Sequence, residues 1–425
     1  MAVGVELEKK AAVKAKGNVR TWIAVTLFVV FFISYIDRTN VSVLIVDHHF
    51  TDTFAVTGDK SSLGLIMTAF LLFYGLCSFF AGPFIERFGV RKSLWLGLLL
   101  WAVLMAIMGS VSSFAVLIAC RALLGAFESF VTPGVSKIIK TWFPIHERAK
   151  ANAAWFNGLL AAQILSMPIV AALVARIGWR GCLFALALIG FFPLVLVCYH
   201  VYDRVSLHPG ITEEEIAYIE DGRKSEDNAA DQGKPGFKFL KKSTFWQLVM
   251  MYCMINAAAW GMLAWLPTFL KETLGFSWTH MGAASAVPYI ASVVGLIIVT
   301  PVIDKYNARS QFACGSIVVF TVCFALTLVF QSSVAVVACI SIAMAGIAIA
   351  SVSSTNIMQN TMEPNEVATA VGFYTGFAYI VSSLFPYAMG ALYNMTGTLD
   401  TGFYMIIAAG LIGILAAVPI LRKRL

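Results

Sequence analysis

The sequence predicts an all-α membrane protein in which twelve transmembrane helices form two pseudo-symmetric six-helix bundles. Composition is the first reason: 59% of the 425 residues are hydrophobic and 12% are charged, whereas soluble domains carry about 25% charged residues. The second is the length of the apolar runs, such as 94–108 and 405–421, which exclude the alternating segments of about ten residues that build a β-barrel. The third is a charged turn that recurs in both halves.

The apolar runs are each long enough to cross a bilayer, which takes about 20 helical residues. The N-terminal bundle, 22–202, is predicted to contain spans at 22–46, 62–84, 93–112, 114–137, 150–174 and 181–202. The C-terminal bundle, 245–421, is predicted to contain spans at 245–270, 280–303, 310–330, 334–359, 367–391 and 400–421. Between them, the long polar stretch 203–244 is predicted to be a cytoplasmic linker, and 1–21 and 422–425 to be cytoplasmic tails.

Lysine and arginine are unevenly distributed among the predicted loops. Twenty-four of the thirty lie in the tails, the linker and the loops on their side, against four on the opposite side: Lys60, Arg176, Arg180 and Lys271. Because cytoplasmic loops carry the excess of basic residues, we expect both termini to be cytoplasmic and the protein to lie in the inner (plasma) membrane. The net charge of +7 therefore indicates membrane topology rather than a nucleic-acid partner.

The recurring turn occupies 82–92 in the first half and 300–310 in the second. Each carries an acid followed by a base at the same place, Glu86 before Arg87 and Asp304 before Lys305. The two halves are therefore interpreted as degenerate copies of one repeat, the alternative being two unrelated charged turns.

Four charged residues lie within or at the end of predicted spans: Asp37, Arg38, Arg121 and Glu128. A charge in the membrane costs at least about 2.5–3.5 kcal/mol, so such residues are functional candidates. Arg121 and Glu128 share one helix face, and Gly125 between them is predicted to leave room for a ligand to approach. Tyr35 and Arg38 also face one way, so one acid and one base from each helix are expected to converge on a central cavity.

Two interpretations of these four charges remain open. The first is a pair of structural ion pairs, Asp37 with Arg121 and Arg38 with Glu128. The second, functional interpretation is proton-coupled symport of an organic anion, in which Arg38 binds the substrate carboxylate through its planar fork. Glu128 then takes up the proton, and Asp37, paired with Arg121 when ionised, is a second coupling carboxylate.

Several segments resemble the anion:cation symporter family of the major facilitator superfamily. The first is the turn at 82–92, which has Glu86 where the family usually has Asp. The second is the end of the first span, at 35–40. The third is the fourth span, at 121–128, together with the segments 142–144 and 147–149 that follow it. The resemblance covers 20–421. The family includes bacterial galactonate, hexuronate and phthalate carriers and animal sialic acid and vesicular glutamate transporters. It implies the major facilitator fold, alternating access, and the same four roles for Asp37, Arg38, Arg121 and Glu128.

Further polar and aromatic residues are candidates for shaping the substrate site. Tyr74 matches a family tyrosine near the substrate, although a tyrosine in a span is also a common packing residue. The other candidates are Tyr35, Arg121, Asn157, Gln163, Trp260, Ser354, Thr375 and Tyr379. Sugar-acid carriers of the family have two asparagines where this chain has Thr375 and Tyr379, so a less hydroxylated carboxylate or a sulfonate is equally allowed.

The charged turns are predicted to act on conformation rather than on substrate. Residues expected to latch helix ends on the cytoplasmic side are Gly82, Glu86, Arg87, Gly89, Arg91 and Asp304. No metal site and no cofactor are expected apart from the proton as coupling ion, since none of the six histidines lies deep in a span. The expected partners are a small organic anion and the lipid bilayer, with a monomer as the working unit.

Rival functions are an exchanger of organic anions or organophosphates, an uncoupled facilitator, and a transporter-like receptor. Exchange of phosphates would favour two central arginines without a neutralising acid, so Glu128 argues against it. A receptor would be expected to carry an appended soluble domain. An enzyme would need a nucleophile with its base or a metal cluster, and the sequence contains neither pattern.

Overall fold

The computed structural model describes residues 19–222, 237–306, 308–362 and 366–422. Eleven helical stretches among these residues are long and apolar enough to cross a membrane. One of them, which contains α8 (Arg148–His200), holds two of the predicted spans, because the chain reverses at Gly178, where φ is 69° and ψ is 172°. The twelve-span prediction is therefore confirmed. The predicted tails at 1–18 and 423–425, and 223–236 of the linker, lie outside the described residues.

The N-terminal bundle contains six spans in five helical stretches. They are α2 (Val19–Leu44), α4 (Lys60–Phe88), α5 (Val90–Ser110), the pair α6 (Phe114–Glu128) and α7 (Val131–Trp142), and the two arms of α8. The short helix α3 (His48–Thr53) follows α2. The fourth predicted span is thus two helices, which meet just after Glu128.

The linker contributes three short described helices before the second bundle begins. They are η2 (Val205–Leu207), α9 (Glu213–Asp221) and η3 (Lys238–Lys241). The C-terminal bundle then contains α11 (Ser243–Thr268) with the π-turn η4 (Phe269–Thr273), α12 (Trp278–Ala284), α13 (Val287–Tyr306), α14 (Arg309–Thr327), α15 (Ser333–Thr361), α16 (Val367–Thr396) and α17 (Asp400–Arg422).

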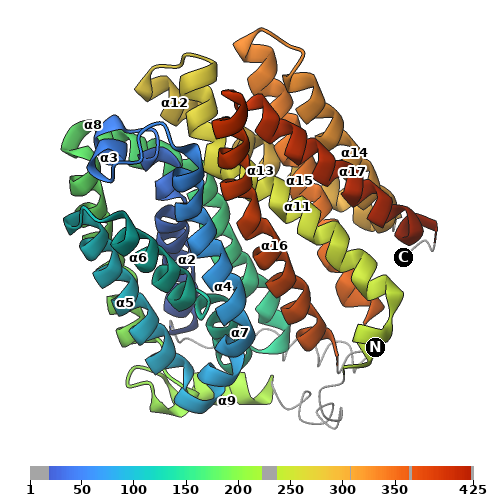
Figure 1. Cartoon of the computed structure of the whole chain (residues 1–425). Coiled ribbons are helices and arrows are strands. Elements are labelled where there is room, and N and C mark those ends of the chain that lie inside the picture. Colours follow the sequence, from blue (N-terminus) through green and yellow to red (C-terminus); the bar gives the residue numbers. More distant parts are fainter. Residues whose placement is uncertain (1–18, 223–236, 307, 363–365, 423–425) are drawn as a thin grey trace.

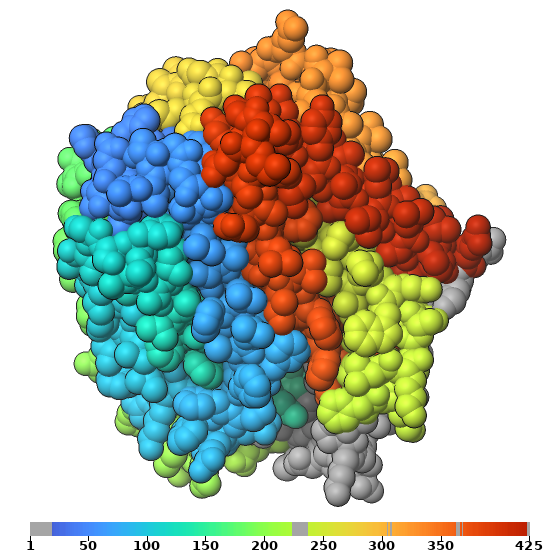
Figure 2. All heavy atoms as spheres, in the orientation of Figure 1, coloured from blue at the N-terminus to red at the C-terminus, as the bar shows by residue number. Residues whose placement is uncertain are grey.

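Helices α4 and α16 lie side by side where the two bundles meet, and their atoms adjoin on the surface drawn in Figure 2. Glycines allow this approach. A Cβ on Gly64 would lie 2.2 Å from the carbonyl oxygen of Pro386, and one on Gly390 would lie 2.2 Å from that of Lys60. Small residues at helix contacts in membranes allow backbones to pack closely, so these two positions hold the bundles together.

We call the end of the molecule that carries α9 and η3 the linker end, and the end that carries α3 and α12 the far end (Figure 1). Polar contacts between the bundles gather in the far-end half. They include the ion pair of Lys60 with Glu272, at 2.6 Å, and a hydrogen bond from the indole of Trp278 to the carbonyl of Ala171, at 2.8 Å. Toward the linker end the contact is aromatic, with the ring of Phe79 against Phe373 and Phe377.

Candidate functional site

A buried ion pair joins α2 to α6 near the middle of the N-terminal bundle. The Nε and Nη2 groups of Arg38 donate to Oε2 of Glu128 at 3.1 and 2.8 Å, and the hydroxyl of Ser34 donates to the same oxygen at 3.2 Å. Arg38 is 5% exposed and Glu128 is 1% exposed. The other carboxylate oxygen of Glu128 has no hydrogen-bond partner in the part of the chain that the structure describes, so this acceptor is incompletely satisfied.

Asp37 is fully buried, and among the described residues neither of its carboxylate oxygens has a partner that meets hydrogen-bond geometry. The indole N–H of Trp101 interacts with the carboxylate of Asp37, but the two groups do not meet the geometry of a full hydrogen bond. A buried carboxylate without a partner is costly in its ionised form.

Arg121 does not form the predicted side-chain pair with Asp37. Its guanidinium instead makes long hydrogen bonds to the backbone carbonyls of Asp37 and Arg38, at 3.3 and 3.4 Å, and to that of Ile66 at 3.5 Å. It also lies 4.8 Å from the ring centroid of Phe70. Carbonyl dipoles and a ring face therefore compensate this buried cation in this conformation, and its pairing with ionised Asp37 stays a prediction.

Gly125 also has a different role from the predicted one. A Cβ at this position would lie 2.1 Å from the carbonyl oxygen of Phe70, so the backbone of α4 occupies the space next to the glycine. The small residue allows two helices to pack rather than a ligand to enter.

Aromatic rings from both bundles surround Arg38. Its guanidinium carbon lies 4.8 Å from the ring centroid of Tyr74, 5.3 Å from that of Tyr35 and 6.0 Å from that of Trp260. The ring of Tyr379, on α16, lies 4.5 Å from Tyr74 and 5.9 Å from Trp260. We call Tyr35, Arg38, Tyr74, Glu128, Trp260 and Tyr379 the central cluster. It lies where α2 and α4 face α11 and α16, so both bundles contribute to it.

Of the other predicted substrate residues, one hydrogen-bonds a member of the central cluster, and the rest lie elsewhere in the two bundles. Gln163 belongs beside the central cluster, because its amide donates to the hydroxyl of Tyr35 at 3.2 Å. Ser354 bonds the hydroxyl of Tyr374 at 2.5 Å within the C-terminal bundle, and Thr375 is half-buried on α16. Asn157, on α8, is exposed and makes no hydrogen bond with the central cluster.

Arg91 and Gly89 hold the linker end of the N-terminal bundle together. Gly89, at φ 87°, joins α4 to α5, and the backbone amides of Val90 and Arg91 both donate to Oδ1 of Asp203, at 2.6 and 3.2 Å. The Arg91 guanidinium donates to the carbonyl of Cys198 at 2.6 Å and lies over the ring of Tyr202. Asp203, which sequence reasoning missed, is therefore the acid that fastens this turn.

The remaining predicted latch residues make few contacts in this conformation. Glu86 and Arg87 are exposed at the end of α4, and the Arg87 guanidinium lies over the ring of the adjacent Phe88. Among the described residues beyond its own helix turn, a Cβ on Gly82 would meet no atom within 4 Å. The side chain of Asp304 lies outside the described residues.

A far-end clasp, formed by Asp59, Lys60, Glu272 and Asn394, was also missed. The amide of Asn394 donates to Oδ1 of Asp59 at 2.6 Å and accepts from the backbone amide of Lys60 at 2.9 Å. Burial alone would raise the pKa of Asp59, but hydrogen bonds from Ser61, Ser62 and Asn394 hold that pKa well below its usual range. The clasp joins α4 to α16 and to η4.

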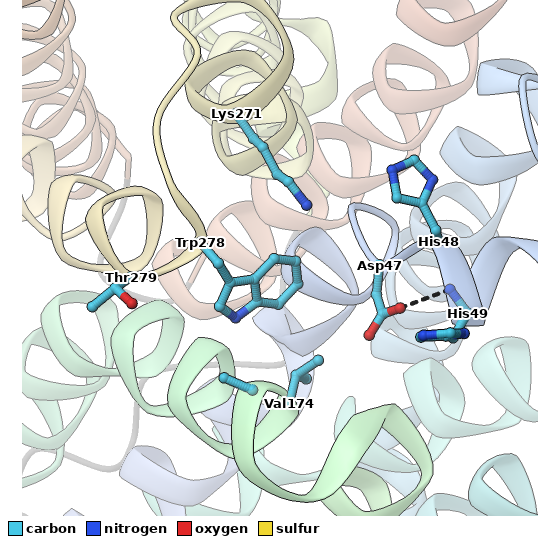
Figure 3. Close-up of a pocket in the computed structure, with 8 residues that line it drawn as sticks. Asp47, His48, His49, Val174, Lys271, Trp278 and Thr279 are labelled. Carbon is cyan, nitrogen blue, oxygen red and sulfur yellow. Dashed lines mark hydrogen bonds between the residues drawn. The ribbon is translucent and has the colours of Figure 1, made fainter.

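A separate open pocket of about 360 Å³ lies at the far end between α3, α8 and the segment from η4 to α12 (Figure 3). The Lys271 ammonium lies 4.5 Å from the ring centroid of Trp278, and Asp47 caps α3 by accepting from the amide of His49. No residue of the central cluster lines this pocket.

A family model described as the Major Facilitator Superfamily matches residues 27–386 and, in a second match, 279–424. The chain belongs to the major facilitator superfamily. It is therefore a multi-pass membrane transporter and not an enzyme. Among solved structures, a bacterial homologue of the human lysosomal transporter Spinster aligns with a TM-score of 0.74 at 16% identity, covering 97% of this chain and 98% of that one. A D-xylose–proton symporter aligns with a TM-score of 0.74 at 13% identity, covering 94% and 96%.

Curated relatives of this superfamily member carry the names of organic-acid transporters. A D-galactonate transporter of Escherichia coli is 28% identical over 70% of both chains. A probable sulfoacetate transporter of Cupriavidus necator is 25% identical over 94% of this chain and 93% of its own. A probable galactarate/D-glucarate transporter of Escherichia coli K12 is 24% identical over 96% and 94%.

Proposed function

We propose that this superfamily member is a proton-coupled symporter that takes up a small organic anion, such as a sugar acid or another carboxylate, by alternating access. The observation that carries the proposal is the buried pair of Arg38 and Glu128. It places an anion-binding cation in direct contact with a protonatable carboxylate.

Competition for Arg38 supplies the coupling. A substrate carboxylate that takes the guanidinium fork removes the cation that stabilises ionised Glu128. A buried carboxylate that loses its cationic partner is costly, so Glu128 takes up a proton as the anion binds. One negative charge then still faces Arg38, and the occupied site carries the same charge as the empty one.

Asp37 fits the role of a second coupling carboxylate. Its full burial, without a well-formed hydrogen bond from the described residues, favours the protonated form in this conformation. Opening of the site to water on one side of the membrane would allow it to ionise, and a change of conformation would then return it to a buried environment.

The position of the central cluster suits alternating access. Residues of both bundles line it, so rocking of one bundle against the other would expose it to opposite sides of the membrane in turn. The far-end clasp would close one side, and the turn at Gly89 and Arg91 would act on the linker side as a latch. We place both termini in the cytoplasm of a protein that works as a monomer in the inner membrane.

The chemistry of the relatives favours an organic acid as the substrate. Their names include galactonate, galactarate, glucarate and sulfoacetate, which share an anionic head group. Arg38 would bind that group, with Gln163 and Tyr74 nearest to the rest of the molecule.

The proposal is tested by uptake of radiolabelled sugar acids, aromatic acids and small sulfonates into proteoliposomes, with and without an inward proton gradient. Gradient-stimulated accumulation of one anion above its external concentration supports symport. Trans-stimulation by internal anion without any response to the gradient would identify an exchanger. Equilibration alone would identify an uncoupled facilitator.

A further inference from the structure

We propose that the central cluster selects an anion whose carboxylate is attached to an aromatic body, and that Tyr379 sets this preference. The inference rests on the proposed function, because it concerns the anion that Arg38 binds. The inference concerns the part of the substrate that is attached to the carboxylate, and not the coupling of transport to protons.

Four aromatic rings form a continuous arc beside Arg38. Ring centroids are 6.4 Å apart between Tyr35 and Trp260, 5.9 Å between Trp260 and Tyr379, and 4.5 Å between Tyr379 and Tyr74. A carboxylate bound at the guanidinium would lie beside this arc. The carbon atoms attached to it then lie against ring faces and edges, which favours a body that is itself aromatic.

Several polar side chains around the arc already have partners within the protein. Gln163 donates to Tyr35 at 3.2 Å, Tyr74 bonds Thr132 at 3.3 Å, and Ser354 bonds Tyr374 at 2.5 Å. Asn256 and Thr355 donate to backbone carbonyls of their own helices at 3.1 and 2.9 Å. A polyhydroxylated acid exchanges its water hydrogen bonds for protein ones, and each of these groups already makes one hydrogen bond within the protein, so fewer of its donors and acceptors are left for substrate hydroxyls.

Tyr379 is the ring on which the arc depends, because it contacts both Tyr74 of the N-terminal bundle and Trp260 of the C-terminal bundle. Its replacement by asparagine opens the arc and adds one amide with free donors and acceptors. The substitution removes a ring face that would contact an aromatic substrate and adds an amide that can bond substrate hydroxyls. Both changes move the preference from aromatic toward hydroxylated acids.

The test measures binding of benzoate and gluconate, two monocarboxylates of equal charge, to the full-length protein purified in detergent. Isothermal titration calorimetry avoids passive permeation of benzoate through a membrane. In the wild type, benzoate is expected to bind more tightly than gluconate by about 10-fold or more. The Tyr379→Asn substitution lowers this ratio at least about 10-fold. The Tyr387→Asn substitution, at an exposed tyrosine of the same helix, leaves the ratio unchanged.

The outcomes separate this inference from the proposed function. Loss of binding of both acids in Arg38→Ala, with benzoate preferred in the wild type, supports both. If both acids bind through Arg38 but gluconate is the tighter ligand, or if Tyr379→Asn leaves the ratio unchanged, the aromatic preference is overturned and the anion site stands. If neither acid binds, or if Arg38→Ala binds both as the wild type does, the proposed anion site is overturned together with the inference.

Discussion

Nε and Nη2 of Arg38 both donate to one carboxylate oxygen of Glu128, while the other oxygen of Glu128 has no partner among the described residues. The guanidinium is thus bound through two of its nitrogens to a single acceptor. An incoming carboxylate can offer two oxygens to the same fork, which is the geometry that arginine binds best. The pair is therefore suited to exchange one carboxylate for another.

The first prediction concerns this fork. Arg38→Lys keeps the charge but replaces a planar group with a point charge, so binding of carboxylate probes such as benzoate and gluconate is expected to weaken by about 10-fold or more. Titration calorimetry of the purified protein measures the effect. Arg180→Lys is the matched control, because Arg180 donates to the carbonyls of Gly109 and Val111 at the far end. Equal affinities in the Arg38→Lys variant and the wild type would contradict the assignment.

The second prediction concerns the packing of α6 on α4. In Gly125→Ala the new methyl group would lie 2.1 Å from the Phe70 carbonyl oxygen, so the helices must separate, at an expected cost of about 1–3 kcal/mol. Thermal unfolding in detergent should show a lower Tm. Gly82→Ala, in a helix where a Cβ meets no atom within 4 Å, should keep or raise the Tm. A Gly125→Ala protein as stable as the wild type would show that α4 and α6 are not in this contact.

The third prediction concerns the far-end clasp. Asn394→Ala removes the amide that bridges Asp59 and Lys60, so states that are open at the far end should become about 5-fold more populated. Spin labels at Ala175 and Thr398, in a background without the native cysteines, report the distance between the bundles. Asn360→Ala, at an exposed site on the linker-end half of α15, should leave the distance distribution as it is. An unchanged distribution in Asn394→Ala would mean that the clasp does not hold the far end closed.

The fourth prediction concerns pH and the linker. Burial, together with the neighbouring charges of His200 and Arg91, lowers the pKa of His208 despite the opposing effect of Glu215. The amide of Gly210 donates to Nδ1 of His208, which needs the neutral ring. Because the pKa in the folded state lies below the unfolded value, this residue contributes stability above about pH 6.5 and loses it as the pH falls.

His208→Gln removes that titration while keeping a side chain with an acceptor. The Tm of the wild type should therefore fall more steeply than that of His208→Gln between pH 7 and pH 5. Parallel curves for the two proteins would show that His208 keeps its proton affinity on folding.

The fold and the two residues of the main ion pair could be predicted from the sequence because local patterns identify both. Apolar runs define the spans, and the cost of a buried charge identifies Arg38 and Glu128 from their positions within those runs. The recurring turn at 82–92 also identifies Gly89, although the acid that fastens it, Asp203, lies more than a hundred residues away in an otherwise ordinary polar segment.

The errors have one physical origin. Helix periodicity shows which residues share a face but not which neighbour that face meets. It places Gly125 between Arg121 and Glu128 but leaves space there that α4 fills, and it does not show that the Arg121 guanidinium lies against the α2 backbone. The far-end clasp was missed for the same reason, since Lys60 and Asn394 are more than three hundred residues apart.

The central claim is that Glu128 carries the coupling proton, and proteoliposomes with an internal pH-sensitive dye test it most directly. In the wild type, an external substrate anion should drive proton influx, and an inward proton gradient should raise anion accumulation by about 10-fold for each pH unit at a one-to-one ratio. Glu128→Gln should keep anion exchange but lose both effects, while Glu214→Gln, at an exposed glutamate of α9, should behave as the wild type. Gradient-driven accumulation that survives in Glu128→Gln would contradict the account.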